Sequence, residues 1–370
     1  MRAVTARRTV LVLVVVVVVG WSSWTAATAD PWKFAVVCDS RGELSGGKGS
    51  TEGVRASVLG PIAAAIAAEG IDLVVFPGDE VAGIARPVNG SFKTQLTRWR
   101  AIMAPLYAAH IPVYAVRGNH DTGREDPTVG ASVNLWRKLM ADLPQGGPPG
   151  EEGLTYRVDH QNATFIGFDA YVHRSPKFNR SKYDGAVNYG LINEWVISQI
   201  RETPAPWVFV FGHETAFIEN HTDCLANAPR ERDALWDALG AKHGVYLCGH
   251  DHMYVRSHAP DANGNEIIEL IVGSGGAGFY PRDEKREAMN ETLDRHVRPA
   301  LDFVNGKVEH GVNTNTDHRP PAFGYLVITV DGNQATGEWK AFANYDAVHW
   351  CAPATPKFET WDTFTLSDGR

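Results

Sequence analysis

Short apolar runs followed by metal-binding side chains are the feature of this chain that most constrains its fold. Most of the runs are rich in Val, Ile and Phe and are bounded by Gly, Pro or polar residues, which is typical of buried β-strands. The side chains that follow are Asp, Asn and His, and the ends of neighbouring strands meet at one edge of a sheet. The sequence therefore predicts a metal site assembled from distant segments. The motifs are Asp39-Ser40-Arg41, Gly78-Asp79, Gly118-Asn119-His120-Asp121, Gly212-His213 and Gly249-His250-Asp251-His252.

Helical patterns separate the early apolar runs, and this alternation predicts an α/β core. Val54–Glu69 is rich in Ala and Ile and stops at Gly70, which suits a helix end. Ser91 is placed to cap a helix that runs to about Ala109, with a break near Pro105. The later strands come with fewer helices, so we expect two stacked mixed β-sheets flanked by helices. Strands are expected at Phe34–Cys38, Leu73–Pro77, Val113–Val116, Thr164–Phe168, Trp207–Phe211, Val245–Cys248, Ile267–Val272 and Tyr325–Val330, and further helices at Leu191–Arg201 and Arg230–Leu239.

The N-terminus has the pattern of a targeting segment. Three arginines precede the unbroken apolar run Val10–Val19, and Ala27-Thr28-Ala29 then fits a small-residue cleavage site before Asp30. An uncleaved anchor is the alternative, but the run is shorter than the ~20 residues that span a bilayer. We therefore predict a signal peptide over residues 1–29, a mature single domain over 30–370, no stable membrane anchor after cleavage, and a secreted or periplasmic protein.

Net charge and cysteine placement narrow the possible partners and cross-links. The formal charge is −8 with a pI of about 6.0, and such an acidic chain is a poor candidate for sequence-independent DNA binding, which relies on Lys and Arg to neutralise phosphates. A local basic patch stays an open alternative. Export makes disulfides possible. Cys38 and Cys248 end apolar strands and are expected to be buried, whereas Cys224 and Cys351 lie in polar stretches and are the better candidates for a bridge.

Two stretches have the composition of surface loops. Residues 143–152 are rich in Pro and Gly, and residues 280–322 are long and polar with several histidines. Long ordered loops often serve as lids over a site, but many are only exposed. For residues 280–322 both interpretations stay open.

The motifs differ in how specific they are. An Asp after a strand is common in turns, so Asp39 or Asp79 alone is weak evidence. A bend at Gly249-His250-Asp251-His252 would turn both imidazoles toward neighbouring ions, whereas the alternative is a polar turn with solvated histidines. Five motifs in one order make that alternative remote.

In these motifs the sequence resembles the calcineurin-like metallophosphoesterase superfamily, from about Phe34 to about Gly276. The family pattern is an Asp-x-His block, then Gly-Asp, Gly-Asn-His-Asp/Glu, Gly-His and Gly-His-x-His, and four of the five blocks match at their key residues. The resemblance implies a four-layer sandwich that holds two metal ions. It implies Asp39, Asp79 and His252 as ligands of the first metal, and Asp79, Asn119, His213 and His250 as ligands of the second, with Asp79 bridging.

The resemblance also implies a reaction, the hydrolysis of a small-molecule phosphoester. Mixed oxygen and nitrogen ligands suit Mn, Fe, Zn or Co. Two such ions ~3.5–4 Å apart would lower the pKa of a bridging water and create a hydroxide that attacks phosphorus in line. Arg41 and His120 are expected to stabilise charge on the phosphoryl oxygens, and His120 to protonate the leaving alkoxide.

Two positions depart from the family pattern. Arg41 stands where the family has His, and a guanidinium has no lone pair for a metal. We therefore expect the first metal to lose a protein ligand and Arg41 to bind the substrate phosphate. Ala82 stands where some members carry the Asp that pairs with the catalytic His. We therefore expect His120 either to have another partner, for which Asp121 is the candidate, or to act without one.

Two other functions compete with this one. A nuclease or nucleotide phosphohydrolase of the same fold would need a basic or aromatic cleft beside the metals. A non-catalytic metal-containing binding protein is the second alternative, because Arg41 replaces a ligand. Turnover of a generic aryl phosphate, measured together with metal content, separates the latter from an enzyme.

Overall fold

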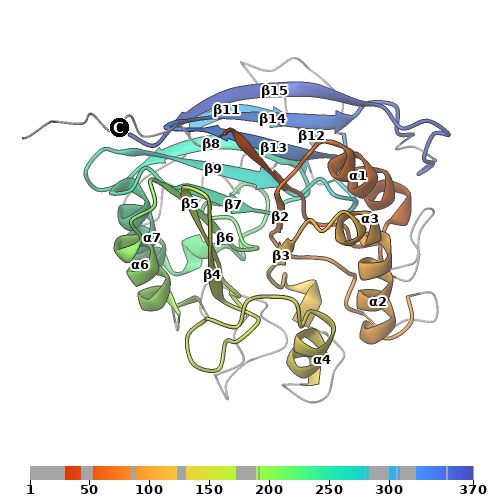
Figure 1. Ribbon diagram of the computed structural model, residues 1–370, viewed down its shortest axis with the longest axis horizontal. Coiled ribbons are helices and arrows are strands. Elements are labelled where there is room, and N and C mark those ends of the chain that lie inside the picture. Colours follow the sequence, from red (N-terminus) through yellow and green to blue (C-terminus); the bar gives the residue numbers. More distant parts are fainter. Residues whose placement is uncertain are drawn as a thin grey trace, which may run out of the picture.

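The computed structural model of the chain shows two β-sheets packed against each other, with helices on their outer sides (Figure 1). This arrangement confirms the predicted α/β fold with two stacked mixed sheets and flanking helices. The described residues are 30–42, 53–84, 89–122, 131–171, 189–190, 192–279, 281–282, 300–305, 307–308, 322–346 and 349–369.

The first sheet has six strands, and its parallel part positions the first three motifs. In order across the sheet the strands are β15 (Phe358–Ser367), β14 (Gln334–Phe342), β13 (Gly324–Asp331), β1 (Trp32–Val36), β2 (Leu73–Phe76) and β3 (Val113–Ala115). Strands β1, β2 and β3 run parallel, whereas β13, β14 and β15 pair antiparallel. The carboxyl ends of β1, β2 and β3 therefore lie side by side.

The second sheet has seven strands and positions the two histidine motifs. Its order is β11 (Ala300–Asn305), β8 (Tyr254–Pro260), β9 (Glu266–Val272), β7 (Val245–Cys248), β6 (Trp207–Phe211), β5 (Ala163–Gly167) and β4 (Tyr156–His160). The central strands β5, β6, β7 and β9 are parallel, and antiparallel strands close both edges. A separate pair joins β10 (Pro281–Arg282) to β12 (Lys307–Val308).

Strand β6 shows how the second sheet separates two hydrophobic cores. Phe209 and Phe211 belong to the larger core, which also contains residues of the first sheet. Val208 and Val210 point to the other face, where they join a second core with residues of α6 (Asn193–Glu202) and α7 (Pro229–Gly240). A strand buried on both faces reads as a continuous apolar run, which is why this strand was predictable.

The helices beside the first sheet begin and end for local reasons. Helix α1 (Ala56–Ala68) starts two residues later than predicted, because Val54 forms an isolated β-bridge with Arg41. Ser91 caps α2 (Phe92–Ile102) as predicted, and its side chain accepts a hydrogen bond from the Thr94 N–H. The predicted break separates α2 from α3 (Ala104–Ala108), which carries Pro105 in its first turn. Helix α4 (Ala131–Leu139) was not predicted.

The sequence patterns missed the strands β4, β8, β10, β11, β12, β14 and β15. In β15 exposed and buried residues alternate over its second half, because one face of this edge strand meets solvent. Alternation of this kind is weaker evidence than a continuous apolar run. The sequence therefore revealed the buried centre of each sheet better than its edges.

The cysteines correct one expectation. All four thiols are free, so the favoured bridge between Cys224 and Cys351 is not formed. Cys224 is buried in a small cluster with Ile218 and Ala226, whereas Cys351 is exposed. Cys38 and Cys248 are buried as expected, and the Cys38 thiol donates to the carbonyl oxygen of Val272 at 3.3 Å.

Two sequence predictions fall outside the described residues. These are the signal peptide over residues 1–29 and most of the long loop over 280–322. Described residues within 280–322 form β10, β11 and β12, so this part of the loop prediction was wrong. Within the part of the chain that the structure describes, no helix is both long and apolar enough to span a membrane.

Candidate metal centre

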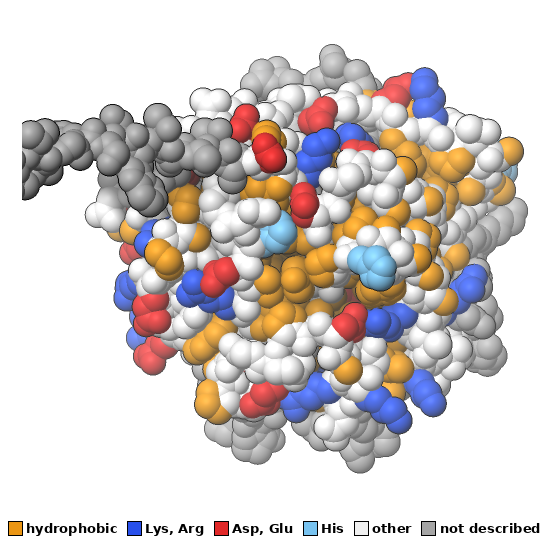
Figure 2. Space-filling model, viewed as in Figure 1, with side chains coloured by type: hydrophobic (Ala, Val, Ile, Leu, Met, Phe, Trp, Pro, Cys, Tyr) orange, Lys and Arg blue, Asp and Glu red, His pale blue; other side chains and the backbone are white. Residues whose placement is uncertain are grey.

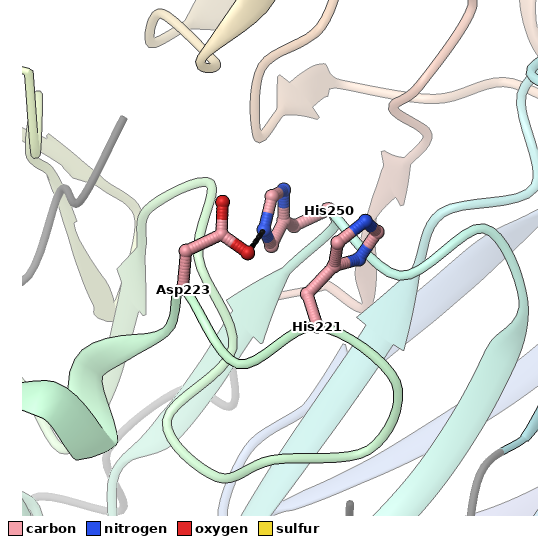
Figure 3. A group of neighbouring side chains, drawn as sticks. All are labelled: His221, Asp223 and His250. Atoms are coloured by element: carbon pink, nitrogen blue, oxygen red, sulfur yellow. Dashed lines mark ion pairs between the residues drawn. The ribbon is translucent and has the colours of Figure 1, made fainter. Parts of the chain in front are cut away.

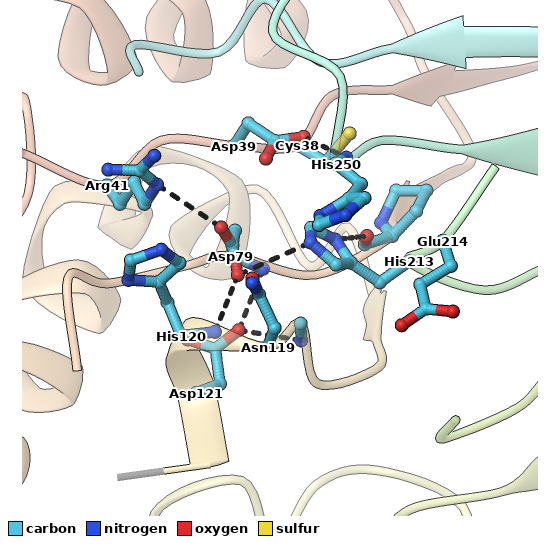
Figure 4. Close-up of polar contacts among 12 residues, drawn as sticks. Cys38, Asp39, Arg41, Asp79, Asn119, His120, Asp121, His213, Glu214 and His250 are labelled. Carbon is cyan, nitrogen blue, oxygen red and sulfur yellow. Dashed lines mark hydrogen bonds and ion pairs between the residues drawn. The ribbon is translucent and has the colours of Figure 1, made fainter. Parts of the chain in front are cut away.

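The five motifs meet where strands of both sheets end (Figure 4). Asp39, Asp79 and Asn119 follow β1, β2 and β3 of the first sheet. His213 and His250 follow β6 and β7 of the second sheet. Backbone hydrogen bonds join neighbouring loops, for example from the Asp39 N–H to the carbonyl oxygen of Gly78. The topology thus brings together residues that are far apart in sequence.

Three of the predicted ligands have a strained backbone. Asp39, Asp79 and His250 have φ values of 57°, 56° and 68°. This left-handed region is uncommon for residues other than glycine, and strain of this kind clusters at functional sites, where surrounding structure holds it. At each of these positions the backbone turns sharply after a strand (β1, β2 and β7), and the residue at the turn is a predicted ligand.

Two motif glycines allow the aspartates to lie against neighbouring loops. A Cβ atom at Gly249 would overlap the carboxylate of Asp39, and one at Gly118 would overlap that of Asp79. The close approach lets Asp39 Oδ2 accept the backbone N–H of His250 at 3.1 Å. Asp79 Oδ1 accepts the backbone N–H of His120 at 3.0 Å. These bonds fix both carboxylates before any ion binds.

Two of the predicted histidine ligands have a defined tautomer. His213 Nδ1 lies 2.8 Å from the carbonyl oxygen of Pro77, and His252 Nδ1 lies 2.6 Å from that of Gly278. A carbonyl oxygen only accepts, so Nδ1 carries the proton and Nε2 keeps the lone pair. Metal-binding histidines are commonly oriented in this way.

Buried polar atoms that lack hydrogen bonds show that the residues fit metal ions. Among the described residues, Asp39 Oδ1, Asn119 Oδ1, His213 Nε2 and His250 Nε2 are buried and make no hydrogen bond. Three of these atoms lie 3.3–3.5 Å from another donor atom of the cluster: Asp39 Oδ1 from His252 Nε2, His213 Nε2 from Asp79 Oδ1, and His250 Nε2 from Asp223 Oδ1. An unsatisfied buried group costs about 1–3 kcal/mol. Ligand atoms of Asp39, Asp79 and His252 also lie within 4.8 Å of one another. This set of oxygen and nitrogen donors is one that transition metals bind.

Electrostatics prepares most of these groups for binding cations. Burial raises the pKa of Asp79, but His213 and other basic neighbours outweigh burial and lower it to about 2. Burial lowers the pKa of His213 to about 4 and, together with Arg41, lowers that of His252. At neutral pH these groups are an ionised carboxylate and neutral imidazoles, the forms that bind metals. Asp39 differs, because burial and then Asp79 raise its pKa.

Sequence comparison decides the family. The family model described as calcineurin-like phosphoesterase matches residues 54–254, more than half of the chain. The chain belongs to the calcineurin-like phosphoesterase family. It is a metal-dependent hydrolase of phosphoric esters. The matched region contains the motifs from Asp79 to His252, whereas Asp39 and Arg41 precede it. A comparison with curated proteins gave no match.

Solved structures share the fold of this phosphoesterase. PhoD superposes with a TM-score of 0.60 at 14% identity, over 92% of this chain and 70% of that chain. Purple acid phosphatase PPD1 from yellow lupin (Lupinus luteus) seeds gives 0.56 at 16% identity, over 92% and 54%. This chain thus matches about half of the lupin enzyme's length. GAP50, the anchor in the inner membrane complex of Plasmodium, gives 0.52 at 13% identity, over 91% and 89%. At such identities the likeness concerns the fold.

Arg41 occupies the part of the phosphoesterase centre where the family pattern has a histidine. Its Nε lies 3.3 Å from Asp79 Oδ2, and its Nη2 lies 3.3 Å from His252 Nε2 (Figure 4 shows the pair with Asp79). The side chain is only 10% exposed. The guanidinium thus contacts two of the three ligands expected for the first metal, and it brings positive charge to that side.

His120 has a partner that the sequence did not reveal. Its Nδ1 lies 2.8 Å from the backbone carbonyl oxygen of Ala82. This is the position at which some family members carry a pairing Asp, so a main-chain oxygen contacts the ring here. The Ala82 carbonyl fixes the proton on Nδ1 of His120, as other backbone carbonyls do for His213 and His252.

Asp121 connects two of the motif loops. Its carboxylate is fully buried and accepts the backbone N–H groups of Asp79 at 2.7 Å and Gly118 at 2.8 Å, and also those of Glu80 and Val81. These bonds hold the Gly78-Asp79 turn against the Gly118-Asn119 turn. The geometry gives Asp121 a part in positioning the ligands.

Sequence reasoning left His221 and Asp223 unassigned, although both lie beside His250. The rings of His221 and His250 have centroids 4.2 Å apart. Asp223 Oδ1 lies 3.3 Å from His250 Nε2. Burial lowers the pKa of His250, but Asp223 outweighs burial and raises it to about 10. The sequence offered only a His and an Asp two residues apart in a loop.

Proposed function

We propose that this chain is an exported phosphoesterase that binds two transition-metal ions and hydrolyses small phosphoric esters. The observation that carries the proposal is the group of buried oxygen and nitrogen atoms that make no hydrogen bond among the described residues. Two of these atoms belong to Asp39 and His250, whose backbone is also strained. Both features have a cost in a folded protein, and metal binding accounts for both. The first metal would be held by Asp39, Asp79 and His252, and the second by Asp79, Asn119, His213 and His250.

The ions and the protein contribute different parts of the reaction. When bound, two ions of Mn, Fe, Zn or Co supply positive charge and an activated water for hydrolysis. Arg41 presents N–H donors to the phosphoryl oxygens, for which the guanidinium fork is well shaped. Asp121 keeps the Asp79 and Asn119 loops in register through its backbone hydrogen bonds.

His120 is proposed to handle the proton of the leaving group. Its Nδ1–H is held by the Ala82 carbonyl, so Nε2 is the ring atom directed elsewhere. In the imidazolium form, the Nε2–H donates to the alkoxide oxygen as the phosphorus–oxygen bond breaks. The fixed ring orientation limits the rearrangement needed for this transfer.

Neither the net charge of the chain nor the face shown in Figure 2 points to a nucleic-acid substrate. Hydrophobic side chains gather in a hollow near the middle of this face, and the Lys and Arg side chains around it are scattered. Nucleic-acid binding needs Lys and Arg to neutralise phosphates along a groove. This distribution of charge disfavours a nuclease or nucleotide phosphohydrolase, and the substrate test includes that alternative.

A substrate panel with metal-reconstituted protein tests the proposal. We expect turnover of nitrophenyl phosphate or of bis-nitrophenyl phosphate in the presence of Mn, Fe, Zn or Co, and none after chelation. Preferential cleavage of single-stranded oligonucleotides would favour the nuclease alternative. Failure to bind any metal, with no turnover of any ester, would overturn the proposed function.

Export is a separate part of the proposal and has its own test. It is supported by the basic start, the Val10–Val19 run and the Ala27-Thr28-Ala29 pattern. N-terminal sequencing of protein recovered outside the cytoplasm should begin near Asp30. Recovery of exported protein that still starts at Met1 would reject cleavage.

A further inference from the structure

A loop that the family pattern does not include reaches the edge of the metal centre. It follows β6 and carries His221 and Asp223 to the side of the His250 ring (Figure 3). Asp223 comes within 3.3 Å of His250 Nε2, and the ring of His221 packs beside that of His250. Two loops that are distant in sequence thus place three metal-binding side chains together.

Asp251 fastens this loop to the histidine motif. Its buried carboxylate accepts the backbone N–H groups of Asn220 and His221, each at 3.0 Å. It also lies 2.6 Å from His221 Nδ1. A carboxylate that accepts from Nδ1 leaves the lone pair on Nε2, which is the arrangement of a carboxylate–histidine–metal triad. Asp251 sits between His250 and His252, so the same turn positions all three imidazoles.

The spacing of the donor atoms suits one ion. His221, Asp223 and His250 each offer a ligand atom, and these atoms lie within 4.8 Å of one another. Ligand atoms bound at ~2.0–2.2 Å in a tetrahedral or similar site lie roughly 3–3.5 Å apart, and the Asp223–His250 distance is 3.3 Å. His250 is 3% exposed, and its buried Nε2 faces the Asp223 carboxylate. Two imidazoles and a carboxylate are a donor set for transition metals.

We propose that His221 and Asp223 are further ligands of the metal ion that His250 binds. The inference rests on the proposed metal centre and adds two donors on its His250 side. Asp223 brings a negative charge to this side, whereas Arg41 brings a positive charge to the side of Asp39 and His252. The Asp223 carboxylate strengthens cation binding on the His250 side, and the Arg41 guanidinium weakens it on the other side. The ion bound by His250 is therefore the tighter of the two.

Metal titration of the metal-free full-length mature protein tests the inference. Calorimetry with Mn²⁺ and with Zn²⁺ should resolve a tight and a weak site in the wild-type protein. Asp223→Asn and His221→Gln should each weaken the tight site by about tenfold to hundredfold or more, the range seen even for groups that only support a ligand. Asp223→Glu keeps a carboxylate and should recover part of the affinity.

A matched control and a second readout separate ligand loss from unfolding. Thr222→Ala changes an exposed side chain between the two proposed ligands and should leave both affinities unchanged. Thermal unfolding by circular dichroism checks that each variant folds. The visible spectrum of the cobalt-loaded protein should change in Asp223→Asn and not in Thr222→Ala.

The possible outcomes distinguish this inference from the function on which it rests. Wild-type affinities and spectra in folded Asp223→Asn and His221→Gln would overturn the inference and leave the metal centre in place. Wild-type protein that binds neither ion would overturn the metal centre as well. Selective weakening of the tight site supports both.

Discussion

The two sides of the centre are built from similar donors but differ in the charge beside them. On the side of Asp39 and His252, the Arg41 guanidinium lies against Asp79 and His252. On the side of His250, the Asp223 carboxylate lies against the imidazole. A cation is therefore opposed on one side and attracted on the other. Two sites with the same pattern of ligands therefore need not bind metal equally tightly, because one neighbouring charge raises or lowers the metal affinity of each site.

The largest effect should come from Asp79, which both sides share. Asp79→Asn removes the proposed bridging carboxylate, so both ions should be lost together with their several kcal/mol of transition-state stabilisation. We expect metal content below one ion per chain and a loss of turnover of about three orders of magnitude or more. Elemental analysis with steady-state kinetics measures both. A variant with full metal content and normal turnover would contradict the assignment of Asp79 as a ligand shared by both ions.

His120 should affect chemistry without separating the two sides. His120→Asn keeps a polar side chain but removes the proposed general acid, so turnover should fall about 10²–10⁴-fold with metal content unchanged. The deficit should be smallest for nitrophenolate, a leaving group that needs little protonation. Parallel kinetics on alkyl and nitrophenyl phosphates measures this difference. An equal loss for all leaving groups would rule out proton donation by His120.

Substitutions of Arg41 test directly whether its charge distinguishes the two sides of the centre. Arg41→Ala should lower kcat/KM by about tenfold to hundredfold, because a hydrogen bond to a charged group is worth about 1.5–3 kcal/mol, and it should leave metal content unchanged. Arg41→His should restore the family's ligand and tighten the weaker site. Metal titration and kinetics on both variants decide this. Wild-type kinetics in Arg41→Ala with every substrate would make Arg41 a bystander.

The smallest effect concerns stability on the His250 side. Burial raises the pKa of Glu269 from 4.5 to about 7, and its carboxylate accepts the backbone N–H of Ala216 on the loop that leads to His221. The folded state binds the Glu269 proton more tightly than the unfolded state does. The protonated group therefore contributes to the free energy of unfolding below pH 4.5, and this stabilisation is lost as the pH rises toward 7. Glu269→Gln should flatten this dependence and stabilise the protein at pH 8 by on the order of 2 kcal/mol. Urea unfolding at pH 5 and pH 8 measures the change, and equal pH dependence in both proteins would contradict it.

The sequence predicted the buried strands and the motifs that follow them, because both are recognisable from residue type. Buried parallel strands such as β6 and β7 read as apolar runs, so the positions of the motifs after them followed. The partner of His120 was not predictable, because it is the backbone carbonyl of Ala82 and every residue type has such a carbonyl. The position of Asp223 depends on the hydrogen bonds of Asp251 to a loop, and no local pattern encodes such long-range contacts.

Because the donors come from strand ends in both sheets, no metal site exists until the two sheets have packed together. The candidate ligands extend from Asp39 to His252, so loops of many residues must close before their side chains meet. Ions that bind only this arrangement would stabilise the completed structure and not the partly folded chain. The cations present where the chain finishes folding would then determine which metal the protein carries.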